Sequence, residues 1–469
     1  MARLLALLIL SLTVVATAAA ATIRGTARAD RIQAADGRSQ TITCGRGLDT
    51  VNADLADRVA ANCEVVAWRI ARDTTSVGGG PQHATIVEPD SASFGTTVVA
   101  AFQVGRVRGG GAGTIGWASS RDSGRTWRSG TLPGVGHASD PTVAFDQVHG
   151  VWIAVTLGIT DNAPTSLDVS RSPNGRTWSR PAHAQSASGE AFDKEFVFCD
   201  NAAASPRRGT CYLAYTDLRA ERIAMTSSTD GGVTWSPPAF VSPRGDVVDG
   251  LPAALPDGTV VVVWLDGSEG GGGSEIRAAR SVDGGVTFSA PVQVAEIRFA
   301  GTPGLRAPPL PALDVDRNGR LLVAWPDCRF RPGCGNDDIV LATSGDGVSW
   351  SAPRRVTTGS FNYSSPGLGA DSRSNGIVVS AQIGPTPDGS STVGAAIAIS
   401  RNGTTWAPTR RLDARAMRLS WLPLAGNARF LGDYLAASWV GGRPFAIVPI
   451  ASPPRAGRFN QALYAGTVR

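Results

Sequence analysis

From about residue 81 to the C-terminus, short runs rich in Val, Ile, Ala and Trp alternate with clusters of Gly, Pro and Asp. Apolar runs of this length, bounded by turn residues at hairpin spacing, predict β-strands. Most of the chain is therefore predicted to be all-β.

A polar pattern recurs between these runs: Ser-x-Asp-x-Gly-x-Thr followed by an aromatic residue. Complete copies span 120–127, 228–235 and 281–288. Partial copies, with the acid or amide one place later, end at Trp178, Trp350 and Trp406. In every copy we expect the Asp or Asn side chain to accept backbone N–H groups, the Gly to adopt positive φ and the ring to fold back onto the sheet. The structural aspartates of the complete copies are Asp122, Asp230 and Asp283.

The terminal aromatic residues of the copies stand at 127, 178, 235, 288, 350 and 406, so they are separated by 51, 57, 53, 62 and 56 residues. A repeat of about 40–50 residues or slightly more is typical of a propeller blade built from four strands. The sequence therefore predicts a β-propeller.

The six copies resemble the Asp-box (BNR) repeat of the sialidase superfamily of β-propellers, over about residues 81–469. Six boxed units already fill about 81–415, and three further strands without a box are expected beyond 428. Residues 63–73 are placed to supply the missing outer strand of that last unit, since closure removes exposed sheet edges. Seven blades are thus favoured over six, whereas the resemblance to sialidases implies six.

The first 21 residues carry one early charge, Arg3, then an apolar core over 4–15 and a run of small residues. This composition is typical of a secretory signal peptide. The alternative, a membrane anchor, needs about 18 or more apolar residues, and this core is shorter. We expect a secreted protein, extracellular or attached to the cell surface, that does not span the membrane.

Residues 22–66 contain aliphatic side chains every 8–10 positions, at Ile23, Ile32, Ile42, Val51 and Val59. This rhythm predicts a small β-roll-like cap, followed by the propeller over 67–469. It resembles the nonapeptide calcium-binding repeats of repeats-in-toxin proteins, with Arg at places where that family has Gly or Asn. The resemblance implies one weak calcium site at Asp30, Asp49 and Asp54. The alternative is a degenerate roll without metal, and no cofactor is required in either case.

Six cysteines in a secreted chain suggest three disulfides. Local pairing joins Cys44 to Cys63, Cys199 to Cys211, and Cys328 to Cys334. Zinc is the alternative, but the spacings are not those of zinc sites and the chain has only four histidines.

The formal net charge is +5, and it is spread along the chain without basic runs. Nucleic acid is therefore not an expected partner. Lys194 is the sole lysine among 44 basic residues. The expected partner is an extracellular glycan or protein, and the expected oligomeric state is a monomer.

The box turn connects the third and fourth strands of a blade, so it lies on the face opposite the loops that follow the second strand. The boxes are then scaffold, and functional groups are expected on the other face. Residues Asp217, Asp266 and Asp327 end second strands there in an aromatic-x-Asp pattern. Each is either part of a site or a cap of its own turn.

The resemblance to sialidases implies a Tyr/Glu nucleophile, an Asp acid/base and three arginines that clamp a carboxylate. By loop position these are Tyr434 with Glu195, Asp140 or Asp193, and the clamp Arg219, Arg306 and Arg329. The family's Arg-Ile-Pro motif is absent, because 83–89 reads HATIVEP. Two classes of function follow: an extracellular propeller that binds glycans or proteins without catalysis, and an exo-glycosidase of the sialidase type acting on sialic acid or a related acidic sugar. Other chemistry, such as lyase activity, is a third alternative.

Overall fold

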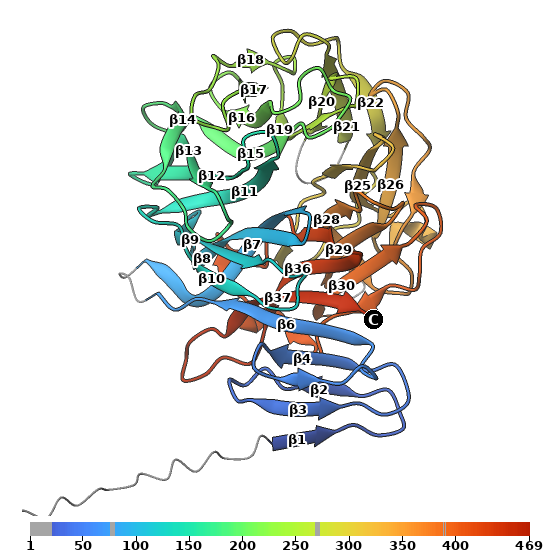
Figure 1. Cartoon of the computed structure of the whole chain (residues 1–469). Coiled ribbons are helices and arrows are strands. Elements are labelled where there is room, and N and C mark those ends of the chain that lie inside the picture. Colours follow the sequence, from blue (N-terminus) through green and yellow to red (C-terminus); the bar gives the residue numbers. More distant parts are fainter. Residues whose placement is uncertain (1–20, 76–79, 268–272, 388, 390) are drawn as a thin grey trace, which may run out of the picture.

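The computed structural model describes residues 21–75, 80–267, 273–387, 389 and 391–469 (Figure 1). The predicted signal peptide lies outside these residues except for its last position. No helix in the described ranges is long and apolar enough to cross a membrane. The chain is all-β, as predicted, with only two short 3-10 turns, Pro332–Cys334 and Leu419–Trp421, among the described residues.

Most strands form four-stranded antiparallel units that follow one another along the chain. The first two units are β7 (Pro81–Phe94), β8 (Thr97–Val107), β9 (Ala112–Ser120) and β10 (Arg128–Thr131), then β11 (Ala138–Asp146), β12 (Val151–Thr160), β13 (Ala163–Ser172) and β14 (Ala182–Ser186). The next two are β15 (Phe192–Cys199), β16 (Cys211–Asp217), β17 (Arg222–Ser228) and β18 (Ala239–Phe240), then β19 (Val247–Ala254), β20 (Val260–Asp266), β21 (Glu275–Ser281) and β22 (Val292–Glu296).

Two further units of the same kind come next. They are β24 (Ala312–Val315), β25 (Leu321–Asp327), β26 (Asp338–Ser344) and β27 (Arg354–Arg355), then β28 (Asn362–Ala370), β29 (Ile377–Gly384), β30 (Thr392–Ser400) and β31 (Arg410–Arg411). A short strand, β32 (Met417–Arg418), also pairs with β30. The last unit contains β35 (Ala436–Val440), β36 (Arg443–Ala451), β37 (Gln461–Val468) and β6 (Val65–Arg72).

The innermost strands of these units form a closed ring around a central axis (Figure 1). Each innermost strand contacts the next one around the ring, in the order β7, β11, β15, β19, β24, β28 and β35. The last of them, β35, contacts β7 and closes the ring. Large side chains such as Trp264 and Trp325 are fully buried between neighbouring sheets. The arrangement is a β-propeller.

Strand β6 joins the N-terminal cap to the ring. It pairs antiparallel with β37, so the predicted pairing of segment 63–73 is confirmed. Its other edge pairs in parallel with β4 (Thr50–Asp54), which pairs with β2 (Arg31–Gln33). The expected boundary between cap and propeller, at 66/67, therefore falls inside one continuous strand.

The cap consists of two parallel sheets stacked face to face. One contains β1 (Ala21–Arg24), β3 (Gln40–Thr43) and β5 (Arg58–Val59), and the other contains β2, β4 and β6. Ile23 lies opposite Ile42, and Ile42 opposite Val59; Ile32 lies opposite Val51 in the second sheet. The aliphatic period is thus the spacing of rungs that stack in one small core.

The three predicted disulfides, Cys44–Cys63, Cys199–Cys211 and Cys328–Cys334, are all present. Disulfides persist in oxidising compartments, so the protein matures in an oxidising environment.

The box turns have the hydrogen bonds that the pattern predicts. Asp283 Oδ1 accepts the backbone N–H groups of Val286 and Thr287 at 3.1 and 3.0 Å, and Ser281 Oγ accepts the N–H of Gly285 at 2.7 Å. Asp122 and Asp230 accept equivalent bonds. Gly285 has φ +91°. The boxes are therefore self-contained turns.

Candidate functional site

Five innermost strands bend at a β-bulge near their first third, and the bulged residue is not glycine. These residues are Glu88, Asp140, Lys194, Asp249 and Ser365, with φ of 48°, 40°, 48°, 67° and 44°. The strand pairing shifts register at the same places. Non-glycine residues with positive φ are uncommon, and bulges re-aim side chains near functional sites. Here they bring charged groups of separate blades together on the axis.

Lys194 Nζ lies 2.8 Å from Asp433 Oδ2 and 3.6 Å from both Glu88 Oε1 and Asp140 Oδ1. Arg306 Nη2 lies 2.6 Å from Asp433 Oδ2. We call Glu88, Asp140, Lys194, Arg306 and Asp433 the central cluster. The Lys194 side chain is only 4% exposed and that of Asp433 1%, whereas that of Arg306 is 41% exposed. The cluster therefore links strands β7, β11 and β15 and the segment before β35 through buried charges.

The environment shifts the pKa values of these groups in different directions. Burial alone would lower the pKa of Lys194, but Asp140, Asp433 and Glu88 raise it well above its usual value. Burial opposes ionisation of Asp433 too, yet Lys194 and Arg306 hold its pKa well below the usual range. Burial raises the pKa of Glu88 to about 7, although Lys194 opposes the shift. Lys194 and Asp433 are thus an ion pair at neutral pH, while Glu88 titrates near neutrality.

The structure places Tyr434 and Glu195 beside this cluster. The Tyr434 ring is buried, packs edge-on against Phe196 at 5.4 Å and lies 5.6 Å below Lys194 Nζ. Burial, then Asp140, Glu88 and Glu195, raise the pKa of Tyr434 well above its usual value.

Burial and Asp140 also raise the pKa of Glu195 well above its usual range. Neither of its carboxyl oxygens has a hydrogen-bond partner among the described residues. Burial thus disfavours the ionised form that Glu195 would need in order to accept the phenolic proton of Tyr434. Asp193 lies next to them in β15, and its carboxylate accepts the N–H of Lys194 at 3.1 Å.

Of the three predicted clamp arginines, the structure brings Arg306 to the central cluster. Arg219 instead donates Nε–H to the Glu190 carbonyl at 3.2 Å. Arg329 pairs with Asp327 of its own blade at 2.7 Å. Asp217 accepts the N–H groups of Arg219 and Ala220, as a turn cap does. Arg219 and Arg329 are therefore engaged by local partners.

A small sheet covers the exposed side of the central cluster. It contains β23 (Leu305–Arg306), β34 (Ala428–Phe430) and β33 (Leu424–Ala425). The Phe430 ring lies 4.5 Å from the Arg106 guanidinium, and Glu88 N–H donates to the Leu431 carbonyl at 3.3 Å. This segment thus packs on Arg106 and Glu88, beside the predicted catalytic groups.

Sequence reasoning missed Glu88 and Arg106 as members of this region, and it placed Asp433 on this face without giving it a role. A usable signal was present: an acid or serine followed by proline, at Glu88-Pro89, Asp140-Pro141 and Ser365-Pro366. Proline has no N–H and is tolerated in a sheet at bulges, so the repeated pair marks the bulged position of an innermost strand.

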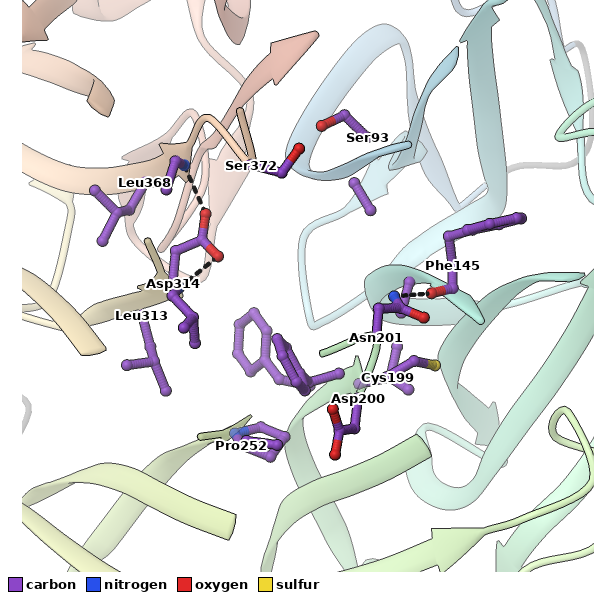
Figure 2. Close-up of a pocket in the computed structure, with 18 of the residues that line it drawn as sticks. Ser93, Phe145, Cys199, Asp200, Asn201, Pro252, Leu313, Asp314, Leu368 and Ser372 are labelled. Carbon is purple, nitrogen blue, oxygen red and sulfur yellow. Dashed lines mark hydrogen bonds between the residues drawn. The ribbon is translucent and has the colours of Figure 1, made fainter. Parts of the chain in front are cut away.

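A separate cavity of about 450 Å³ lies in the central channel, beyond the bulges and toward the ends of the innermost strands (Figure 2). Its walls include Asp90 and Ser91 of β7, Phe145 of β11, and Phe196 of β15. Arg317 and Ser372, also in its lining, are exposed. The cavity therefore reaches solvent at the ends of the innermost strands, which is the face of the box turns.

Two carboxylates face this cavity from separate blades. Asp90 Oδ2 accepts the N–H of Val143 at 2.8 Å. Asp314, labelled in Figure 2, accepts the N–H of Ala370 through Oδ2 at 2.7 Å. Each carboxylate thus bridges to the next innermost strand. Burial raises the pKa of Asp90, and burial raises the pKa of Asp314 to about 6.

The three aspartates predicted to hold calcium make separate contacts in the cap. Asp30 accepts a hydrogen bond from the Thr26 hydroxyl at 3.1 Å, Asp49 Oδ1 accepts the N–H of Asp30 at 2.7 Å, and Asp54 pairs with Arg69. Within the described ranges, no group of three or more His, Cys, Asp or Glu side chains is arranged to hold a metal ion.

Comparison with known proteins gives distant structural likenesses only. No model of a protein family and no curated protein matches the chain. A Dyadobacter fermentans protein of unknown function has 18% identity and a TM-score of 0.46, covering 68% of this chain and 96% of that one. A leech intramolecular trans-sialidase has 13% identity and a TM-score of 0.48, covering 66% and 68%. A Penicillium chrysogenum α-L-arabinanase has 14% identity and a TM-score of 0.44, covering 71% and 93%.

The chain is thus a β-propeller that is similar to sialidases and arabinanases in architecture. At these values the similarity carries no argument about substrate or mechanism.

Proposed function

We propose that the protein is a secreted β-propeller of seven blades that binds an extracellular ligand, a glycan in the first place, and does not hydrolyse sialosides. The observation that carries the proposal is a separation in space. The groups expected to catalyse, Tyr434 and Glu195, are buried and do not line the described cavity, which reaches solvent; Tyr434 adjoins the cavity only through the wall residue Phe196. Its volume of about 450 Å³ is within the range of small-molecule sites.

The cavity walls support a sugar-sized ligand. Carboxylates and serine hydroxyls, at Asp90, Ser91 and Asp314, offer hydrogen bonds, and phenyl rings such as Phe196 offer an apolar surface. A few polar groups placed on apolar walls are the usual composition of a ligand site.

The test uses the purified mature protein in two assays. We expect no release of 4-methylumbelliferone from sialyl or arabinosyl conjugates, and we expect saturable binding on an array of extracellular glycans. Phe196→Ala should weaken that binding, and Arg244→Ala, in an exposed ion pair with Glu221, serves as the matched control. Hydrolysis of the sialyl or arabinosyl conjugates would contradict the proposal. Glycan binding that Phe196→Ala leaves unchanged would contradict it too.

A second candidate function is glycoside hydrolysis at the central cluster. The observation that favours it is the pair of carboxyl groups whose pKa values are driven apart, Glu88 upward to about 7 and Asp433 downward. Such divergence is the pattern of an acid and a base in one site. If this candidate is correct, Tyr434→Phe and Glu88→Gln each abolish turnover in a protein that still melts cooperatively.

A further inference from the structure

We propose that the channel cavity binds a ligand carrying a protonated amine, an amino sugar or a polyamine, and that it rejects acidic sugars. We call the cavity the channel site; it is defined here by Asp90, Asp314, Phe196, Phe198 and the rim residue Arg317. The inference rests on the proposed binding function and names the chemistry of the ligand.

The lining of the channel site is strongly acidic. It contains four carboxylates, Asp90, Asp200, Asp314 and Asp316, and one cationic side chain, Arg317. Arg317 is exposed at the rim. Asp316 is paired with Arg320 at 2.7 Å, which leaves Asp90, Asp200 and Asp314 against Arg317. The field inside the channel therefore favours cations and repels a further carboxylate.

Asp90 and Asp314 lack the cationic partners that several buried aspartates of this chain have, and the buried Asp49, Asp200, Asp337 and Asp371 likewise accept only N–H and O–H groups among the described residues. Neither Asp90 nor Asp314 forms an ion pair with a described residue; their contacts are backbone N–H groups and the Thr142 hydroxyl. Elsewhere, Arg or Lys side chains pair with the buried aspartates Asp54, Asp327, Asp338, Asp413 and Asp433. In a chain with so many arginines, two unpaired carboxylates facing a cavity indicate a place for an external cation.

The free acceptor capacity of these carboxylates is directed to the same space. A carboxylate has about four lone-pair sites, and Asp314 uses one N–H bond on each oxygen. Asp90 and Asp314 repel one another electrostatically, which helps to raise the pKa of Asp314 after burial has done most of it. A cation bound between the two carboxylates would offset their mutual repulsion and the unfavourable burial of their charges.

Phenyl rings complete a site suited to an ammonium group. Phe196 and Phe198 line the cavity from β15. Figure 2 shows Phe145 near Asn201 at one side of it, where the Phe145 ring stacks on Phe94 at 4.4 Å and is therefore not counted among the rings of the site. Cations are attracted to the faces of aromatic rings, more strongly when desolvated. Carboxylates and ring faces together recognise an amine and discriminate against an anion of the same shape.

The experiment is isothermal titration calorimetry with a matched series of probes at about pH 6. The series is glucosamine, glucose, glucuronate and putrescine. We expect glucosamine to bind at least about tenfold more tightly than glucose, the effect of one charge-assisted hydrogen bond, and glucuronate not to bind. Putrescine binding as tightly as glucosamine would also support the amine site and would assign it to polyamines.

The variants Asp90→Asn and Asp314→Asn keep an oxygen that can accept the backbone N–H. Each should weaken glucosamine about tenfold more than it weakens glucose, in a protein whose melting temperature shows that it is folded. Arg244→Ala is the control and should change neither affinity.

Equal affinities for glucose and glucosamine would overturn the amine inference and leave the proposed glycan-binding function standing. Glucuronate binding more tightly than glucosamine would overturn the amine inference as well. So would a glucosamine affinity that neither Asp→Asn variant changes. Binding of none of the four probes would overturn it, while the glycan array decides the proposed function independently.

Discussion

Lys194 is the residue on which the centre of the ring depends. It is the sole lysine of the chain, and it lies buried among carboxylates contributed by three other segments. An ammonium is a compact charge with three donors, whereas a guanidinium is a larger planar fork. The short, divergent contacts to Asp433, Glu88 and Asp140 require the compact group. This explains a lysine in a chain whose other basic residues are arginines.

We predict that Lys194→Met destabilises the protein by about 3–5 kcal/mol, because it leaves buried carboxylates without their cation. Urea unfolding monitored by tryptophan fluorescence measures the loss. Arg244→Met removes an exposed ion pair, which is screened by solvent, and should cost far less than Lys194→Met. A loss below about 1 kcal/mol for Lys194→Met would refute this account of the central cluster.

Asp337 makes stability depend on pH. Burial raises its pKa from 3.8 to about 7, although the N–H groups of Ala300 and Gly301 oppose the shift. A folded-state pKa above the unfolded value means that the native state holds the proton more tightly. The stability that Asp337 contributes is present in full below the pKa that this carboxyl has in the unfolded chain. It is lost as pH rises toward the folded-state pKa of about 7.

We therefore predict that Asp337→Asn reduces the fall in unfolding free energy between about pH 5 and pH 8 by on the order of 2 kcal/mol. Urea titrations at the two pH values measure it. The exposed substitution Glu190→Gln should leave the difference as it is in the natural protein. An unchanged difference in Asp337→Asn would show that Asp337 does not carry this dependence.

At the scale of elements, the box turn is a hairpin loop stabilised from within. The pKa of Asp283 lies well below its usual range, and the largest causes are the hydrogen bonds that the Ser281 and Thr287 hydroxyls donate to its carboxylate. A depressed folded-state pKa gives stability that is present above the unfolded pKa and lost as pH falls. Since the hydrogen bonds of the Asp283 side chain are all local, they stabilise the turn between its own pair of outer strands.

We predict that Asp283→Ala costs about 1–2 kcal/mol of unfolding free energy at neutral pH, the loss typical of a capping side chain. The cost should shrink as pH falls below about 4, because the Asp283 carboxylate of the unfolded chain is then protonated while that of the folded turn is still ionised, so the turn's contribution to stability is lost. Val286→Ala in the same turn, whose side chain is exposed, is the control. A cost that stays constant down to about pH 2 would argue against an ionised acceptor.

At the scale of the whole molecule, the N-terminal cap and the ring share one sheet. Strand β6 is the outer strand of the last unit and the first strand of the cap's second sheet, so neither part ends in a free edge there. Residues near the two ends of the chain thereby close the ring.

We predict that the amides of β6 exchange with deuterium as slowly as those of β37, because β6 is hydrogen-bonded on both edges. The outer strand β14, which pairs only with β13, is the internal comparison and should exchange much faster. Hydrogen-exchange mass spectrometry resolves the three segments. Exchange of β6 at the rate of β14 would contradict the shared sheet.

What the sequence determined by itself is local. The box hydrogen bonds, the three disulfides, the rungs of the cap and the strands between boxes each depend on residues within about one repeat of one another. Their signals are therefore visible as spacing. Even the pairing of segment 63–73 followed from counting strands, since an open ring leaves an edge that must be filled.

Only the tertiary structure decided the chemistry of the axis. Asp433 N–H donates to the Glu88 carboxylate across 345 residues of sequence, and Lys194 reaches both through bulges that no spacing rule locates. The protonation states of Glu195 and Tyr434 depend on burial and on charges from other blades, so their loop positions predicted proximity but not reactivity. The channel site likewise exists only because ring closure brings Asp90 and Asp314 to face the same space. Burial and charge are sums over neighbours in space, and the chain order does not contain them.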